Sequence, residues 1–119
     1  MPYARVIPIR SGKIEACKRM LAEMLGPRRD DYEKALIGEG ITEEYFWIQS
    51  GREGDFLIIY NDGDAALRER IREVRATSSE PFDVWFREQF RTALGIDLTH
   101  PAAGARVEQV GSWVAGGTG

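Results

Sequence analysis

Residues 40–61 contain two neighbouring runs that are rich in aromatic and β-branched side chains. Such runs are typical of β-strands, and the polar sequence between them, residues 51–54, has two glycines that suit a tight turn. We therefore predict a β-hairpin in which Ser50 pairs with Asp55. This register places six side chains on one face: Glu44, Phe46, Ile48, Leu57, Ile59 and Asn61. The other face carries Tyr45, Trp47, Phe56, Ile58 and Tyr60.

Hydrophobic residues elsewhere recur every three or four positions, which is the spacing of an amphipathic helix. The first such stretch covers residues 14–37 and is predicted to break at Pro27, because proline cannot continue the helical hydrogen-bond ladder. Two more helices are predicted over residues 65–76 and 80–94. The apolar stripe of the second helix is expected to consist of Leu67, Ile71 and Val74.

Two further segments are predicted to be strands. Residues 3–10 are short and aliphatic, and Pro8 within them favours an edge position because it lacks a backbone donor. Residues 105–114 are expected to form the last strand. The resulting order, β-α-β-β-α-β, predicts an α+β class and a ferredoxin-like split βαβ fold, with a four-stranded antiparallel sheet and helices on one face. We expect one domain over residues 1–115 and a flexible tail over 116–119.

The face of this sheet that points away from the helices would carry the aromatic side chains of the hairpin. A surface of that kind is too apolar to remain in water. Packing against a second copy of the chain would bury it, so we predict a homodimer with two-fold symmetry, that is, a dimeric α+β barrel.

Composition narrows the classes of partner and cofactor. A net charge of −3 over 119 residues argues against a nucleic-acid binder, and no apolar run reaches the length of a membrane span. The single Cys17 fits a reducing, cytoplasmic setting. One His and one Cys cannot form a typical zinc site, and no phosphate loop or dinucleotide-binding glycine pattern is present, so we expect neither metal nor cofactor.

Four short motifs resemble those of an uncharacterised bacterial family of small dimeric α+β-barrel proteins: Ser11-Gly12-Lys13, Gly40-Ile41-Thr42-Glu43-Glu44, Gly54-Asp55-Phe56-Leu57 and Glu80-Pro81-Phe82-Asp83. The resemblance covers residues 3–100. The family is in turn distantly similar to antibiotic-biosynthesis monooxygenases and polyketide cyclases. It implies a role in secondary metabolism and a pocket inside each subunit, between sheet and helices. This chain has Glu80 where a His is expected, so the resemblance does not supply the acid and base residues.

Glu44 is the predicted catalytic residue. A carboxylate that faces an aromatic-lined cavity loses hydration, which raises its pKa and suits it to proton transfer near neutral pH. The alternative interpretation is structural, with Glu44 half in water at the end of its strand and paired with an arginine.

Seven other side chains are candidates for binding a substrate: Tyr32, Asn61, Asp83, Trp85, Phe86, Arg87 and His100. Each also has a structural interpretation. Asn61 precedes a turn, Asp83 and Arg87 have the spacing of an intrahelical ion pair, and the aromatic residues have the spacing of a helix core. His100, the only histidine, precedes a proline in a connecting segment.

These features together predict a protein that binds a small apolar, aromatic or polyketide-like molecule. As an enzyme it would be cofactor-independent, with Glu44 as base or acid in a cyclase, isomerase or monooxygenase type of reaction. The alternative is a non-catalytic ligand-binding or structural dimer module.

Overall fold

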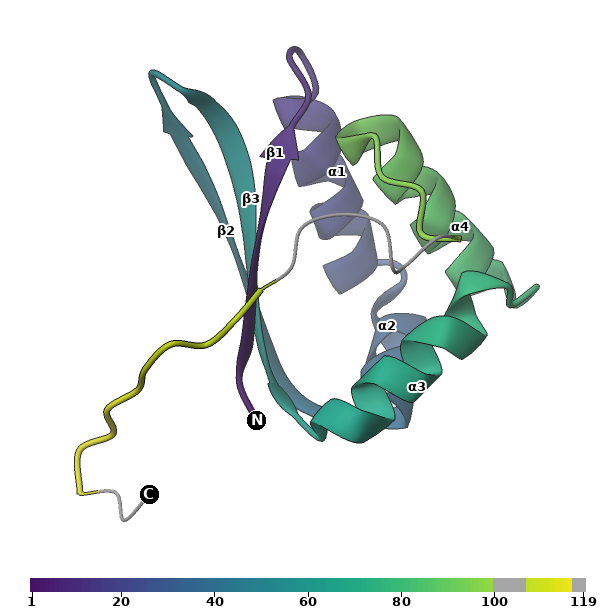
Figure 1. The fold of residues 1–119 in the computed structure, drawn as a ribbon. Coiled ribbons are helices and arrows are strands. Elements are labelled where there is room, and N and C mark those ends of the chain that lie inside the picture. The colour runs from purple at the N-terminus through teal and green to yellow at the C-terminus, as the bar shows by residue number, and fades with distance from the viewer. Residues whose placement is uncertain (100–106, 117–119) are drawn as a thin grey trace.

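The computed structural model describes residues 1–99 and 107–116 of the chain. Its sheet has three antiparallel strands in the spatial order β1-β3-β2. Figure 1 shows the helices on one side of this sheet, as predicted. The α+β class is therefore confirmed. The strands are β1 (Tyr3–Ile9), β2 (Ile41–Gly51) and β3 (Gly54–Gly63).

The hairpin register predicted from the turn is confirmed. Ser50 pairs with Asp55, and Glu44 pairs with Asn61. The turn is shorter than the four residues expected, because Gly51 and Gly54 still pair with each other and leave only two residues between them. β1 lies at the edge of the sheet, which is where proline is tolerated in a strand.

The helices begin and end close to the positions that the sequence predicts. The Asp64 carboxylate accepts a 2.9 Å hydrogen bond from the Leu67 N–H at a helix start. Gly95 ends the last helical segment with a left-handed φ of 69°. The break at Pro27 is present. The helical elements are α1 (Ile14–Leu25), α2 (Arg29–Gly38), α3 (Ala65–Ala76), α4 (Pro81–Gln89) and the π-helical segment η1 (Phe90–Leu94).

The predicted fourth strand is not formed. Residues 107–116 contain no strand and run away from the sheet as an extended segment in Figure 1, while residues 105 and 106 lie outside the described part. The sequence supplies a reason, because Val107, Val110 and Trp113 follow each other every three positions. In a strand, side chains alternate every two positions, so Val107 and Val110 would point to opposite faces. Neither face would be apolar enough to hold the segment on a sheet.

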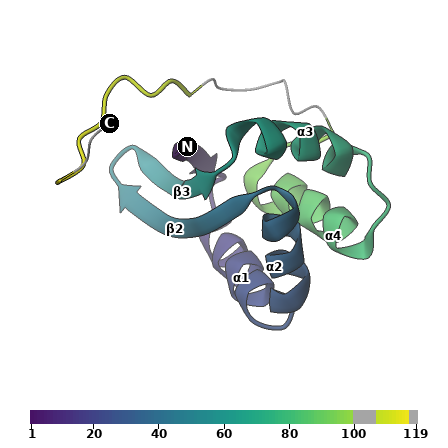
Figure 2. The ribbon, with the colours of Figure 1, turned by 90° about the horizontal axis from the view of Figure 1, so that it is seen from below.

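The hydrophobic core lies between the sheet and the helices (Figure 2). Its centre comes from both β-strands and helices, and Cys17 is fully buried there as predicted. A smaller cluster, Met24, Tyr32 and Phe82, joins α1, α2 and α4. The largest fully buried side chains are Ile7, Met20, Met24 and Leu57.

The opposite face of the sheet remains open. Trp47 and Tyr45 are 52% and 48% exposed, and Val6 from β1 is 56% exposed. The Tyr45 ring stacks on Trp47 with centroids 5.9 Å apart and contacts Tyr60 at 6.0 Å. The hairpin thus divides its two faces as predicted, with a contiguous aromatic surface on the side without helices.

Candidate functional site

A cavity of about 180 Å³ lies between the sheet and the helices. All three strands contribute side chains to its wall, as do α1, α2, α3 and α4. One part of the wall is apolar and consists mainly of Met20, Leu21, Met24, Phe46, Phe82 and Phe86. The remaining wall is polar and contains Glu44, the predicted catalytic residue.

Glu44 is held by two hydrogen bonds from opposite sides. The Tyr32 hydroxyl of α2 donates to its Oε1 at 2.7 Å. The Asn61 amide of β3 donates from Nδ2 to its Oε2 at 3.1 Å. Asn61 reaches Glu44 because the two residues are directly paired across β2 and β3. Three candidate residues from separate elements therefore meet at one carboxylate.

The surroundings of Glu44 change its acidity. Burial raises the pKa of Glu44 above its ordinary value of 4.5, and the hydrogen bonds from Tyr32 and Asn61 oppose that rise without cancelling it. Burial and the adjacent carboxylate also raise the pKa of Tyr32, so the phenol stays protonated and remains a donor. Glu44 is therefore a carboxylate poised to exchange a proton, next to a phenol that does not compete for that proton.

The hydrogen-bonded chain continues beyond Asn61. Arg68 of α3 donates from Nη1 to the Asn61 Oδ1 at 2.6 Å, and this arginine is only 6% exposed. Because Arg68 occupies the oxygen of the amide, the Asn61 nitrogen is directed at Glu44. Arg68 thus fixes which way the amide points.

A second polar cluster closes another side of the cavity. Arg75 of α3 forms an ion pair with Glu39, at the end of α2, and donates from Nε to the Asp83 Oδ1 of α4 at 2.7 Å. Burial alone would lower the pKa of Arg75, but the two carboxylates outweigh it and raise that pKa. One guanidinium therefore joins three helical elements around the cavity.

Asp83 and Arg87 do not form the ion pair that their spacing predicts. Asp83 pairs with Arg75 instead. Arg87 donates to the backbone carbonyls of Arg75 and Ser78, both at 2.7 Å. The reason is the position of the α3 C-terminus, whose carbonyls lack helical partners and attract a cation. Both side chains still line the cavity.

The remaining candidates differ in location. Phe86 lines the cavity, and its ring lies 4.5 Å from that of Phe90. Trp85 is not among the cavity-lining residues in the described part of the chain. It packs on Phe82 and lies beneath the Arg28 guanidinium, whose Cζ is 4.5 Å from the ring centroid. His100 lies outside the described residues.

The arginines of α3 were missed by the sequence prediction. The predicted apolar stripe was wrong at Val74, which is 59% exposed, whereas Arg68 and Arg75 point inward. A signal was present, because Arg68, Arg72 and Arg75 recur at the same helical spacing as the hydrophobic residues beside them. The same spacing is also typical of a solvent-exposed helix face, so the pattern alone does not select the cavity.

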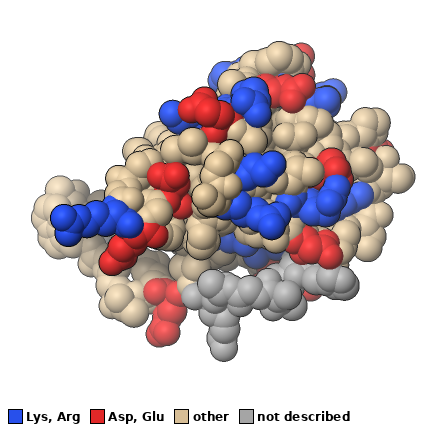
Figure 3. Space-filling view, turned by 90° about the horizontal axis from the view of Figure 1, so that it is seen from above, with Lys and Arg blue, Asp and Glu red and all other residues tan. Residues whose placement is uncertain are grey.

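Comparison of the chain with family models, with curated proteins and with solved structures gave no match. None of the described helices combines the length and hydrophobicity that crossing a bilayer requires. Within residues 1–99 and 107–116, no group of His, Cys, Asp and Glu side chains is arranged to hold a metal ion. Figure 3 shows one face of the molecule, on which acidic and basic side chains are interspersed rather than separated.

Proposed function

We propose that the protein binds a small organic molecule in the cavity between sheet and helices and that Glu44 transfers a proton to and from it. The observation that carries this proposal is the desolvated Glu44 carboxylate, held at the cavity wall by Tyr32 and Asn61. The apolar part of the wall suits an aromatic or polyketide-like body.

The proposed chemistry begins with a C–H bond next to a carbonyl group. The Glu44 carboxylate accepts the proton, and the electron pair of the C–H bond moves into the carbonyl to form an enolate. Return of the proton from Glu44 to a different carbon completes an isomerisation. Attack of the enolate carbon on a second carbonyl of the same molecule forms a ring and an alkoxide, and Glu44 returns its proton to that alkoxide to complete a cyclisation. In an oxygenation, molecular oxygen is the second substrate and the oxidant: the enolate carbon bonds to it, and Glu44 returns its proton to the resulting peroxide anion, giving a hydroperoxide. The base is a side chain, so the proton transfer itself requires no cofactor.

Hydrogen exchange measures this proton transfer directly, whichever product the enolate goes on to form. Aryl alkyl ketones and cyclic monoketones are incubated in D₂O with the protein, and loss of the signal of the C–H bond next to the carbonyl is followed by NMR. We expect accelerated exchange for a compound that binds, and a loss of about a hundredfold or more in Glu44→Gln. Glu43→Gln is the matched control, because the Glu43 carboxylate is exposed and accepts from Tyr45 instead. Equal exchange rates in wild type and Glu44→Gln would contradict the proposal.

A non-catalytic role for Glu44 is the second candidate, and one observation favours it. The hydrogen-bonded chain Tyr32–Glu44–Asn61–Arg68 joins α2, β2, β3 and α3, as expected of a structural network. In that case Glu44→Gln lowers the melting temperature and leaves exchange unchanged. A catalytic Glu44 gives the reverse result. Measuring both quantities on the same variant separates the two functions.

We further propose that the domain is a ferredoxin-like variant and that two copies pack into a dimeric α+β barrel. The strand order β1-β3-β2 with helices on one side supports the first part, because it is that of a ferredoxin-like sheet without its fourth strand. The exposed aromatic surface around Tyr45 and Trp47 supports the second, since a second copy would remove it from water.

A further inference from the structure

The charged side chains of the cavity are unequally paired. Five arginines of the described chain line it, and one of them, Arg75, takes both Glu39 and Asp83 as partners. Arg87 is satisfied by backbone carbonyls. Among the described residues, the other three arginines have no carboxylate within ion-pair distance. These three, which we call the arginine cluster, are Arg5, Arg68 and Arg72.

Arg68 is the decisive member of the cluster. It is only 6% exposed, yet the one side chain of the described residues to which it donates is the neutral Asn61 amide. Its other hydrogen bonds are long ones, at 3.5 Å, to the Met1 carbonyl oxygen. The nearby Asp62 carboxylate is engaged with the Met1 amino group at 2.7 Å. A buried guanidinium without a counter-charge is costly, because lost hydration is not repaid by an ion pair.

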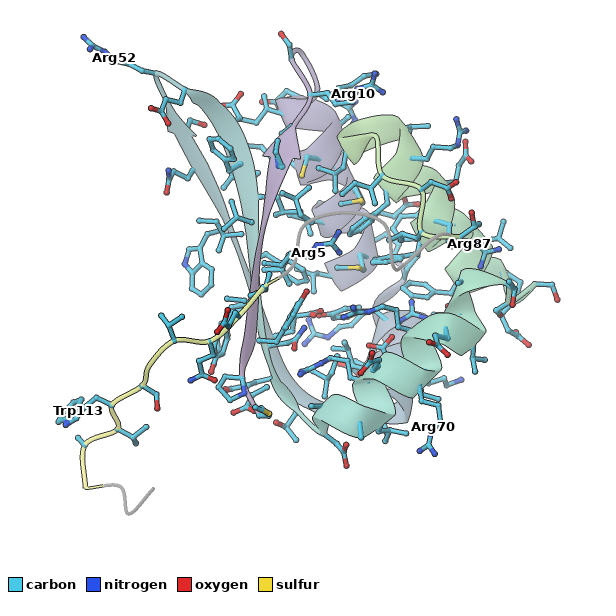
Figure 4. The ribbon with its side chains drawn as sticks, viewed as in Figure 1. Arg5, Arg10, Arg52, Arg70, Arg87 and Trp113 are labelled. Carbon is cyan, nitrogen blue, oxygen red and sulfur yellow. The ribbon has the colours of Figure 1, made fainter. Side chains whose placement is uncertain are left out.

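Two of the three guanidinium groups lie against the Tyr3 ring, and the third, Arg5, is close enough to be affected by both Tyr3 and Arg72. The Cζ atoms of Arg68 and Arg72 lie 5.2 and 5.6 Å from the centroid of that ring. Burial lowers the pKa of Arg5, and the charge of Arg72 lowers it further while Tyr3 opposes the change. Figure 4 shows Arg5 reaching from β1 into the space between sheet and helices, whereas Arg10, Arg52 and Arg70 point away from it. Three cations thus line one part of the cavity, and none of them forms an ion pair with a carboxylate of the described chain.

The sheet register relates this cluster to Glu44. Tyr3 pairs with Asn61, and Asn61 pairs with Glu44, so the three residues form one row across β1, β3 and β2. Neighbouring strands are about 4.8 Å apart, which places Tyr3 and Glu44 at opposite ends of a row spanning about 10 Å, with Arg68 bound to Asn61 in the middle. A molecule of moderate size can touch both ends.

We propose that the arginine cluster binds an anionic group, a carboxylate or a phosphate, of the molecule that occupies the cavity. Guanidinium groups match both anions through paired N–H donors. Arg68 is held in place by Asn61, and the exposed Arg72 stands at the solvent side, where it can receive a ligand. The inference rests on the cavity of the proposed function, and it adds that the substrate is an acid with its reactive carbon near Glu44.

A titration of the full-length protein tests the inference. The probes are benzoate, phenyl phosphate, inorganic phosphate and the neutral benzamide, added in phosphate-free buffer and followed by amide NMR signals. We expect an aromatic anion to shift the signals of Tyr3 and Asn61 and to bind at least about tenfold more tightly than benzamide. Comparison of benzoate with phenyl phosphate identifies the preferred anion. Binding of inorganic phosphate would show that the anion alone suffices.

Variants locate the binding to the cluster. Arg5→Gln and Arg72→Gln should each weaken anion binding by about tenfold. Arg70→Gln on the outer side of α3 is the matched control and should leave the affinity unchanged. Arg72 is exposed, so its replacement leaves the core intact. Equal affinity for benzoate and benzamide, equal losses in Arg70→Gln and Arg72→Gln, or no anion-induced shift at Tyr3 would overturn the inference.

The outcome is independent of proton transfer. Suppose that Glu44→Gln still binds the anion and exchanges hydrogen as fast as wild type does. The arginine cluster then remains a binding site, and Glu44 has no catalytic role. Exchange that depends on Glu44 but is equally fast for a neutral ketone and for a ketone that carries a carboxylate would remove the arginine cluster from substrate recognition and retain catalysis.

Discussion

The Tyr32 hydroxyl donates a 2.7 Å hydrogen bond to Glu44 Oε1, and the two residues come from different elements, α2 and β2. This bond favours the charged form of a carboxylate that burial disfavours. The pKa of Glu44 therefore reflects two opposing effects, burial and hydrogen bonding, and a mutation of Tyr32 tests the second of them.

Tyr32→Phe removes the hydrogen bond and keeps the ring. Because that bond lowers the pKa of Glu44, we expect the pKa to rise further above its ordinary value of 4.5. The measurement is a ¹³C NMR titration of the glutamate carboxyl groups. Tyr45→Phe is the control, since the Tyr45 hydroxyl donates to Glu43 on the exposed side of the hairpin. An unchanged Glu44 titration in Tyr32→Phe would show that the hydroxyl does not stabilise the carboxylate.

The stability of the fold should depend on pH through Glu44. Its folded-state pKa is raised, so the folded chain binds this proton more tightly than the unfolded chain does. The free energy of unfolding therefore falls as pH rises from the ordinary pKa of 4.5 through the raised value. In Glu44→Gln this contribution is absent. Urea unfolding of both proteins over that pH range should show that the free energy of unfolding of wild type falls relative to that of Glu44→Gln as pH rises. Parallel plots of unfolding free energy against pH would contradict the expectation.

Arg75 should be a major contributor to stability. Its side chain is 20% exposed, and its partners Glu39 and Asp83 are 12% and 13% exposed, so removing the cation leaves two carboxylates in a poorly hydrated place. We expect Arg75→Met to cost about 3–5 kcal/mol of unfolding free energy. Arg91→Met removes the exposed pair with Glu88 and should cost less than about 1 kcal/mol. Chemical denaturation compares the two variants, and similar costs would show that the Arg75 ion pairs contribute no more than a surface pair does.

Gly63 is required by the close approach of two backbones. A Cβ at this position would lie 2.2 Å from the Gly40 carbonyl oxygen and 2.8 Å from the Ile41 Cα. Both obstacles are backbone atoms, so we expect Gly63→Ala to destabilise the fold by more than about 2 kcal/mol. A Cβ at Gly38 would meet no heavy atom within 4 Å, and Gly38→Ala in α2 should be neutral or stabilising. Thermal unfolding of the two variants distinguishes a local clash from a general effect of replacing glycine.

Features set by local pattern were predictable from the sequence. The hairpin register follows from the 51–54 turn, and it correctly placed Glu44 opposite Asn61. The break at Pro27 and the end at Gly95 follow from backbone chemistry that needs no tertiary information. These local rules placed Glu44 beside Asn61 and put Tyr32 on a helix, whereas the expectation of a cavity between sheet and helices came from the family resemblance.

Features set by long-range pairing were not predictable. Arg75 and Glu39 are 36 residues apart, and nothing in either local sequence selects the other. Asp83 likewise pairs with Arg75 rather than Arg87, although the local spacing favours Arg87. The same limit applies to residues 105–114, because a strand depends on a neighbouring edge as much as on its own residues.

The aromatic surface gives the last prediction. If two copies bury it, the protein should elute with twice the 13.4 kDa chain mass in size exclusion with light scattering. Trp47→Glu places a charge in the centre of that surface and should produce a folded monomer, because an unpaired charge is costly in an apolar interface. Ile37→Glu is the control, since Ile37 is 75% exposed on α2, away from the sheet face. A wild-type monomer, or equal effects of the two substitutions, would contradict the dimer. The cavity of each subunit lies on the helix side of the sheet, so monomeric Trp47→Glu should retain the hydrogen bonds around Glu44.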